Sequence, residues 1–146
     1  MSNETQYCTF YLDENFFGIE VGRVQEILRF QEMTEVPLSA PVIRGLINLR
    51  GQIMTAVDLR ERVGLPPRSD GRRPINVVIR RSDGGVSLLV DEIGDVMSPA
   101  EDLLEAPPEN VDPRIRALLQ GVYKLEGRLL QILDPDKLME FEGAAA

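Results

Sequence analysis

The chain has 146 residues, with 16 basic and 24 acidic side chains and a formal net charge of -8. This length suits one domain of ordinary size, and a content of 43% apolar residues is enough to build a buried core. The negative charge argues against a nucleic-acid-binding protein, because a polyanion is bound by a basic face. We therefore expect no nucleic acid among its partners.

The residue types that are missing exclude most common catalytic sites. The chain has no His and one Cys, Cys8. It therefore lacks a Ser-His-Asp triad, a Cys-His pair, a His-containing zinc site and an internal disulfide, and it carries no histidine that could be phosphorylated. We expect a binding protein rather than an enzyme, with no catalytic residue, no metal and no cofactor.

The chain shows no sign of secretion or of membrane insertion. Residues 1–6, MSNETQ, are polar and acidic, unlike a secretory signal, and no run of 18 apolar residues exists. A lone Cys fits a reducing compartment. We expect a cytoplasmic protein that does not insert into a membrane.

The first half begins with a predicted hairpin. Cys8–Leu12 and Phe16–Val21 are rich in β-forming residues and are separated by a short polar turn. Residues 22–30 carry apolar side chains at helical spacing and predict one or two helical turns.

The rest of the first half predicts two more strands and a linker. Leu46–Leu59 has β-branched and apolar residues on both sides of Gly51, which predicts two strands or one bent strand. Residues 65–71 combine breakers with polar residues and predict a linker.

The second half repeats this order of strands. Pro74–Arg80 and Val86–Val90 predict a hairpin around a tight turn at residues 82–85. Two further strands are expected within Gly121–Leu133, with a bend near Gly127.

Two short helices are predicted from their first residues. Asp112-Pro113 and Asp134-Pro135 each place an Asp at the cap position and a Pro in the first turn. We expect these helices to continue to about Gln120 and Phe141.

The two halves form an internal repeat. Three residues of the first half recur 76 positions later, so that Gly45, Gly51 and Asp58 correspond to Gly121, Gly127 and Asp134. The apolar residues from Phe17 to Ile27 recur 69 positions later, from Val86 to Val96. The change of offset places a seven-residue insertion in the second half, between Met97 and Leu119.

The repeat has the right size for two small closed β-barrels, each of about five short strands, one for each half. The expected limits of the two halves of the repeat are about 7–67 and 73–141. Neither half could bury much apolar surface alone, so we expect a shared apolar interface that unites them as one domain over residues 7–141. The expected fold class is mainly β with short helices.

The symmetric aspartates Asp58 and Asp134 invite comparison with two-lobed aspartic proteases, in which each half supplies one catalytic Asp. The protease pattern requires Thr or Ser and then Gly after the Asp. Here Leu59-Arg60 and Pro135-Asp136 follow. We therefore interpret Asp134 as a helix cap and Asp58 as the end of a strand that caps the next turn.

Three further features are interpreted as structural. Cys8 lies in an apolar strand pattern and is expected in the core. Residues 91–112 contain eight carboxylates and no Lys or Arg, at an irregular spacing that favours a solvated face over a metal site. A solvated position, with phosphate binding as the alternative, is also expected for the arginines around the linker, which are Arg68, Arg72, Arg73, Arg80 and Arg81.

Five motifs, in the same order, resemble the CheW family of chemotaxis coupling proteins. The central motif is GLINLRG at 45–51, followed by VDLR at 57–60. The others are GIEV at 18–21, VQEI at 24–27, LVDEI at 89–93 and GRLLQILD at 127–134. The similarity extends from about Cys8 to Met139, which is nearly the whole chain.

This resemblance implies a cytoplasmic, non-enzymatic adaptor made of two SH3-like five-stranded β-barrels. Members of the family couple transmembrane chemoreceptors, the methyl-accepting chemotaxis proteins, to the histidine kinase CheA and build receptor–kinase arrays. They bind the CheW-like regulatory domain of the kinase through barrel-to-barrel contacts, and the cytoplasmic tip of the receptor in a groove. The resemblance does not identify the residues of the kinase interface.

The resemblance also implies a receptor-contact region, which the residue types support in part. The expected receptor-binding residues are Val24, Glu26, Ile27, Arg44, Gly45 and Arg50. Arg50 lies at a bend, where its guanidinium could bind Glu26 and a polar group of a receptor helix. Val24 and Ile27 could supply apolar contact for that helix. The alternative is that Glu26 and Arg50 form only an intramolecular ion pair, and that Gly45 serves the backbone geometry.

A second functional class stays open beside the stand-alone adaptor. The chain could be the regulatory domain excised from a CheA-type kinase, or part of a coupling protein that also carries a receiver domain. A chain that starts at Met1 and ends soon after Phe141 favours the stand-alone adaptor.

Overall fold

The computed structural model describes residues 5–37, 40–68, 72–81 and 84–140. Strands dominate it, with short helical turns between them. In chain order the elements are β1 (Tyr7–Leu12), β2 (Asn15–Glu20), the 3-10 turn η1 (Val21–Arg23), β3 (Val24–Leu28), β4 (Ile43–Leu49), β5 (Gln52–Asp58), α1 (Leu59–Val63), β6 (Ile75–Arg81), β7 (Gly84–Val90), β8 (Glu92–Ile93), the 3-10 turn η2 (Glu101–Leu103), α2 (Pro113–Arg116), β9 (Leu119–Leu125), β10 (Arg128–Leu133) and α3 (Pro135–Leu138).

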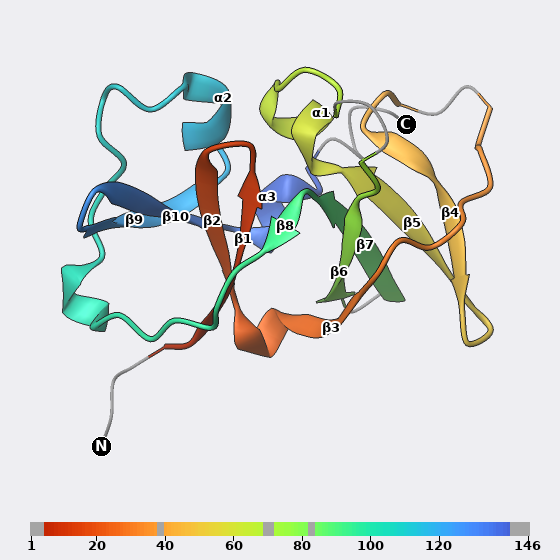
Figure 1. The fold of residues 1–146 in the computed structure, drawn as a ribbon, viewed down its shortest axis with the longest axis horizontal. Helices are drawn as coiled ribbons and strands as arrows, with labels where there is room; N and C mark the ends of the chain where they lie inside the picture. Colours follow the sequence, from red (N-terminus) through yellow and green to blue (C-terminus); the bar gives the residue numbers. More distant parts are fainter. Residues whose placement is uncertain (1–4, 38–39, 69–71, 82–83, 141–146) are drawn as a thin grey trace.

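The strands form two five-stranded sheets that lie side by side (Figure 1). The first sheet has the order β8-β1-β2-β10-β9 and the second has the order β3-β6-β7-β5-β4. Each sheet therefore combines the hairpin of one half with three strands of the other. In Figure 1 the red β1–β2 hairpin stands beside the blue β10, although they come from opposite ends of the chain.

Two parallel strand pairings join the two halves, and the register of both pairings follows the sequence repeat. In the first sheet Gln131 lies opposite Phe17, and in the second sheet Thr55 lies opposite Val86. Thr55 and Gln131 are 76 positions apart, and Phe17 and Val86 are 69 apart. The expectation of one barrel for each half is therefore wrong, because hairpins β1–β2 and β6–β7 are exchanged between the halves. The expectation of a mainly β fold with two five-stranded units is confirmed.

The apolar core has three parts, of which the largest is shared by both sheets. That shared core joins Phe17 of the first sheet, Leu88 of the second sheet and Ile115 of α2, all of them buried. Two smaller clusters lie in the separate sheets, around Met54 in the second and around Leu130 in the first. These two residues correspond in the repeat. The shared apolar interface expected from the sequence is thus present, and it is the main core of the molecule.

The repeated glycines Gly45 and Gly121 serve the backbone, which is the alternative given above for Gly45. A Cβ on Gly45 would lie 2.7 Å from the carbonyl oxygen of Thr34, and one on Gly121 would lie 2.7 Å from that of Glu105. At both places a passing segment pairs with the strand through two backbone hydrogen bonds, at Thr34–Leu46 and at Glu105–Val122. Such a close approach leaves no room for a side chain.

Most strand predictions are confirmed, and the exceptions have physical reasons. Residues 24–28 form strand β3 instead of helical turns, because they pair with β6, and only η1 before them is helical. Helix α2 ends at Arg116, since Leu119 already belongs to β9. The expected Asp caps are confirmed, as the side chains of Asp58, Asp112 and Asp134 each accept a backbone N–H of the following helix.

Three further predictions reach beyond the described residues. The tight turn at 82–85 includes residues 82–83, the linker at 65–71 includes residues 69–71, and the second helix was expected to reach Phe141. These positions lie outside the part of the chain that the structure describes.

The hairpin exchange predicts that neither half folds alone. Fragments 1–70 and 71–146, produced separately, should lack cooperative unfolding, because each sheet needs strands of both halves. Refolded together from denaturant, they should regain the β-sheet circular dichroism spectrum and the melting transition of the intact chain. Cooperative thermal unfolding of either fragment alone would contradict the shared architecture.

Candidate functional site

A surface ion pair joins the two outer strands of the second sheet. Glu26 lies on β3, at one edge, and Arg50 lies in the two-residue turn between β4 and β5, at the other edge. Arg50 donates from Nη1 to Glu26 Oε2 at 2.5 Å and from Nη2 to Oε1 at 2.7 Å. This bidentate arrangement is the strong geometry for a guanidinium and a carboxylate. The ion pair expected between these residues is present.

The ion pair is exposed and sits on a strained turn. The Arg50 side chain is 67% exposed, so water screens the pair and it adds little to stability. The hydrogen bond from Arg50 holds the pKa of the Glu26 carboxyl below its ordinary value, and the same contact raises the pKa of Arg50. Arg50 has a φ of 52°, in the left-handed region that a residue with a Cβ rarely adopts. Gly51 also has a positive φ, of 87°, and this combination is the one that a two-residue hairpin turn favours.

Two exposed apolar side chains lie close to the pair in the sequence. Ile27, next to Glu26, is 40% exposed, and Ile53, at the start of β5 after the Arg50 turn, is 62% exposed. Val24, by contrast, is partly buried and packs against the shared core. We name Glu26, Ile27, Arg50 and Ile53 the Glu26–Arg50 surface. Exposed isoleucines on β3 and β5, the strands next to the pair in the chain, suit the apolar face of an amphipathic helix.

The other two expected contact residues do not join this surface. The Arg44 side chain donates to the buried carboxylate of Asp58 and belongs to a separate ionic network. Gly45 is explained by the close approach of Thr34. Ile53 was not predicted, although an isoleucine beside the buried Met54 in an alternating strand is a usable signal.

The second half of the repeat lacks the ion pair. The positions that correspond to Glu26 and Arg50 are Asp95 and Glu126, which are both acidic and both exposed. Two carboxylates repel one another, so no pair of this kind can form there. The Glu26–Arg50 surface is therefore specific to one half, whereas the glycines and the helix caps are common to both.

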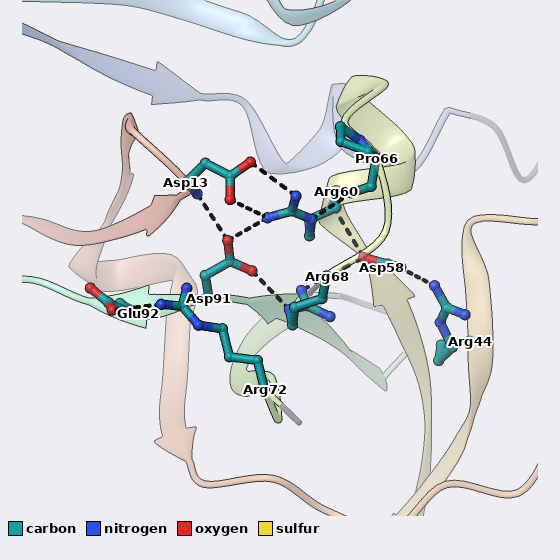
Figure 2. A network of polar contacts seen from close by, with 9 residues as sticks. All are labelled: Asp13, Arg44, Asp58, Arg60, Pro66, Arg68, Arg72, Asp91 and Glu92. Carbon is teal, nitrogen blue, oxygen red and sulfur yellow. Dashed lines mark hydrogen bonds and ion pairs between the residues drawn. The ribbon is translucent and has the colours of Figure 1, made fainter. Parts of the chain in front are cut away.

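A buried ionic network lies where the two sheets meet (Figure 2). At its centre Arg60 of α1 is 4% exposed and donates from Nη1 and Nη2 to the carboxylate of Asp13, at 2.9 Å each. Arg60 Nη1 also donates to Asp91 Oδ2 at 2.5 Å, and Nε donates to the Pro66 carbonyl at 2.7 Å. Its guanidinium thus has protein partners on all three nitrogens.

The network links elements of both sheets. Asp13 lies in the β1–β2 turn of the first sheet, and Asp91 follows β7 of the second. Arg68 donates from Nε to Asp91 Oδ1 at 2.8 Å and extends the network toward Asp58, 3.9 Å from its Nη2. Asp58 in turn binds Arg44 on β4. Charged contacts therefore run from the first sheet to the outer strand of the second.

The sequence did not predict this network, and two expectations about it are wrong. Asp91 and Arg68 were expected on solvated surfaces, but their side chains are only 1% and 11% exposed. Each buries its charge because the other supplies an opposite charge. The signal lay in the VDLR and LVDEI motifs, where Arg60 and Asp91 stand directly beside buried apolar strands.

The remaining candidate groups behave structurally. Cys8 is a buried free cysteine, and burial raises the pKa of its thiol, so the core position expected for it is confirmed. Among the described residues, no group of three or more His, Cys, Asp or Glu side chains is placed to hold a metal ion. None of the described helices is long and apolar enough to cross a membrane.

Known proteins resemble this chain along almost its whole length. The family model of the CheW-like domain matches residues 6–142. The chain is 33% identical to chemotaxis protein CheW of Bacillus subtilis (strain 168) over 135 residues, which are 92% of this chain and 86% of the relative. It is 31% identical to chemotaxis protein CheW of Thermotoga maritima over 137 residues, which are 94% of this chain and 89% of the relative.

A solved structure gives the same result for the fold. The crystal structure of scaffolding protein TtCheW from Thermoanaerobacter tengcongensis matches with a TM-score of 0.85 and 26% sequence identity. The match covers 98% of this chain and 92% of that one. It supports the SH3-like arrangement of the two five-stranded sheets.

Arg60 is expected to be a major source of stability. Arg60→Gln should lower the unfolding free energy by about 3 kcal/mol, near the lower end of the cost of breaking a buried pair, because Arg68 still neutralises Asp91. Urea denaturation measures this loss. Arg114→Gln is the matched control, since the Arg114 side chain is 66% exposed, and it should change stability by less than about 0.5 kcal/mol. Equal stability of the two variants would refute the role of Arg60.

The pH dependence of stability should be flat near neutrality and steep in acid. Without His, no side chain has an ordinary pKa between about 5 and 8. Arg60 holds the pKa of Asp13 below its ordinary value, so the folded state favours the ionised carboxylate. That stability is fully present above about pH 4 and is lost as the pH falls through the lowered pKa.

Thermal unfolding between pH 8 and pH 2 measures this dependence. The Asp13→Asn variant should melt lower than the wild type at neutral pH and should lose less on acidification, because the ionised group is already gone. A midpoint near pH 6 in the wild type would contradict this assignment.

Proposed function

Because the chain belongs to the CheW family, we propose that it is a non-enzymatic adaptor that couples chemoreceptors to a histidine kinase in chemotaxis signal transduction. The single observation that carries this proposal is the family match, which spans residues 6–142. The likeness to a scaffolding protein over 98% of the chain supports it. Its partners are then other chemotaxis signalling proteins, and it has no catalytic residue of its own.

The finer part of the proposal concerns two partners. One is the CheW-like regulatory domain of a CheA-type kinase, which would contact the sheets by their edges. The other is the cytoplasmic tip of a chemoreceptor, which would bring the adaptor to the inner face of the membrane. The two sheets share one core and one ionic network, so they form one body that can hold two partners at fixed positions.

The Glu26–Arg50 surface is the proposed receptor contact. An amphipathic helix could pack its apolar side chains on Ile27 and Ile53. Arg50 could then bind a polar group of that helix while it keeps Glu26, because its guanidinium has five donor hydrogens. The exposure of the Arg50 side chain supports a binding role over a merely structural one, because an exposed ion pair adds little to stability.

Signal transmission in such an adaptor requires a difference in contact free energy. A receptor state that binds the Glu26–Arg50 surface more tightly shifts the coupled kinase by no more than that difference. A rigid adaptor suits this transmission, because a flexible adaptor would change its own conformation instead of shifting the state of the kinase. The alternative, that the chain is the regulatory domain of a kinase, predicts instead that it binds a separate coupling protein.

Kinase coupling can be tested by pull-down. The chain should bind an isolated CheA regulatory domain with a dissociation constant in the micromolar range. A coupling protein supplied as the bait tests the alternative in parallel. No binding to the regulatory domain at tens of micromolar, with binding to the coupling protein, would favour the kinase-domain alternative.

Receptor coupling can be separated from stability at Arg50. Arg50→Gly should leave the melting temperature equal or higher, because glycine accepts a φ of 52° without strain. The variant should still weaken binding to a receptor hairpin fragment, as should Arg50→Glu. Arg114→Glu is the matched control, because the Arg114 side chain on α2 is exposed. A loss of melting temperature with unchanged hairpin binding would assign the pair to structure alone.

A further inference from the structure

A buried amide ties the end of β3 to the two strands beside it in the second sheet. Asn76 on β6 and Ser87 on β7 are both fully buried, at 0% exposure. Asn76 Nδ2 donates to the Arg29 carbonyl oxygen at 3.1 Å, and Asn76 Oδ1 accepts from the Ser87 hydroxyl at 2.8 Å. Arg29 directly follows Leu28, the last residue of β3. A fully buried side chain therefore holds the backbone at the end of an outer strand.

The pairing of β3 with its own sheet is short and interrupted. Among the described strands it pairs only with β6, because it lies at the edge of the sheet. Val24 lies opposite Ile79, and two residues later Glu26 lies opposite the neighbouring Val78. Two steps along β3 thus match one step along β6, which makes Gln25 a bulge. An outer strand with a bulge has few ladder hydrogen bonds and opens locally at a low cost in free energy.

The bulge decides to which face of the sheet Glu26 points. Val24 packs against the shared core. Glu26 lies opposite Val78, which belongs to the smaller core cluster of the second sheet. Without the extra residue Glu26 would follow Val24 onto the shared-core face, because alternate residues of a strand share a face. The ion pair of Glu26 with Arg50 therefore depends on this register of β3.

The first sheet has different residues at the place of the amide. The positions that correspond to Asn76 and Ser87, 69 residues earlier, are Tyr7 and Gly18. Neither of these two side chains carries an amide, and Gly18 has no side-chain acceptor or donor at all. The buried amide is therefore specific to the second sheet.

The first sheet also holds the segment that corresponds to β3 in a different way. The Thr9 hydroxyl donates to the Asp95 carbonyl at 2.5 Å, and Asp95 corresponds to Glu26. A second carboxylate, Glu126, stands there in place of Arg50. The fold therefore does not require an amide at this place, and the amide occurs in the sheet that carries the ion pair.

Stability alone does not call for a polar pair here either. Replacing both partners of a buried hydrogen bond by apolar groups of similar shape is nearly neutral for the free energy of unfolding. An amide supplies something that an apolar side chain lacks, because a hydrogen bond is directional and selects one carbonyl. Such a bond fixes the register of a strand, whereas apolar contact tolerates a shift.

We propose that Asn76 is a positioning residue for the Glu26–Arg50 surface, an inference that rests on the proposed function. Its amide holds the Arg29 carbonyl, three residues or about 10 Å of strand beyond Glu26. The contact of Val24 with the shared core fixes the other end of β3. A receptor helix then meets a surface that is already ordered, so that ordering does not reduce the binding free energy.

The test separates binding from stability in a variant that lacks the amide. Asn76→Leu/Ser87→Ala replaces both partners by apolar groups, so the melting temperature should change by no more than about 4 °C. The affinity for a soluble receptor hairpin fragment should nevertheless fall about 10-fold, which is the scale of the ordering cost that the amide removes. Ser87→Ala alone keeps the bond to Arg29 and should bind the hairpin like the wild type.

Gln31→Ala is the matched control for the bond to Arg29. Gln31 Nε2 donates to the same carbonyl at 3.1 Å, but from two residues along the chain, so it does not connect β3 with β6. This variant should leave both the affinity and the melting temperature unchanged. An equal loss of affinity in Gln31→Ala would assign the effect to the loop after β3 and would overturn the role of Asn76.

Two further measurements follow β3 without the receptor. In Asn76→Leu/Ser87→Ala, amide hydrogen exchange over residues 25–28 should be about 10-fold faster, while exchange in β7 stays unchanged. The pKa of the Glu26 carboxyl, which Arg50 holds below its ordinary value, should rise toward that value as the ion pair loosens. NMR spectroscopy of the full chain measures both.

The outcomes distinguish this inference from the proposed function. If the wild type binds the hairpin and the double variant binds equally well, Asn76 has no positioning role, while the adaptor function stands. If affinity and melting temperature fall together in the double variant and in Ser87→Ala, the pair serves stability alone. If the wild type fails to bind the hairpin, the proposed function falls, and the receptor role of Asn76 with it.

Discussion

Parallel pairing of β2 with β10, and of β7 with β5, is the constraint on which the rest of the structure depends. A parallel pair cannot be joined by a short turn, so its two strands come from distant parts of the chain. Here each pair unites strands of different halves. Once both pairs form, every sheet contains both halves, and the apolar faces of the hairpins are buried in one shared core.

The exchange also explains why a charged network is buried at the junction. The β1–β2 turn carries Asp13 into reach of Arg60, which lies in the helix that follows β5. Arg60 is itself buried and needs carboxylate partners, and it is held in place by the Pro66 carbonyl and by Asp91. The network thus fixes one hairpin against the other sheet, and its charges make that position specific.

Local features could be predicted from the sequence, because their causes are local. Asp134 before a Pro is a cap, and a glycine that recurs after 76 residues marks a backbone requirement, whatever the fold around it. The exchange of hairpins could not be predicted, because the same alternating pattern fits pairing within a half or between halves. Strand β3 was missed for a related reason, since five residues are too few to separate a strand from a helical turn.

Some residues of the candidate site could be predicted from the sequence and others could not. The Glu26–Arg50 pair was predicted, because the resemblance places both residues in one contact region and their charges are opposite. Arg44 was assigned to the same site, yet its side chain contacts Asp58 and belongs to the buried ionic network. Sequence proximity therefore places residues on one strand but does not place them on one surface.

The differences between the two halves say more about function than their similarities. Selection for the fold accounts for what both halves keep, namely the glycines at close approaches and the aspartate caps. The fold accounts for the left-handed backbone at Arg50, because Arg50 and Gly51 form a two-residue hairpin turn that favours a positive φ at both positions. It does not account for the basic charge of Arg50, since the corresponding residue is Glu126 and an exposed ion pair adds very little to stability. A binding role gives that charge a physical reason, and it places the role on the half that contains β3 and the β4–β5 turn.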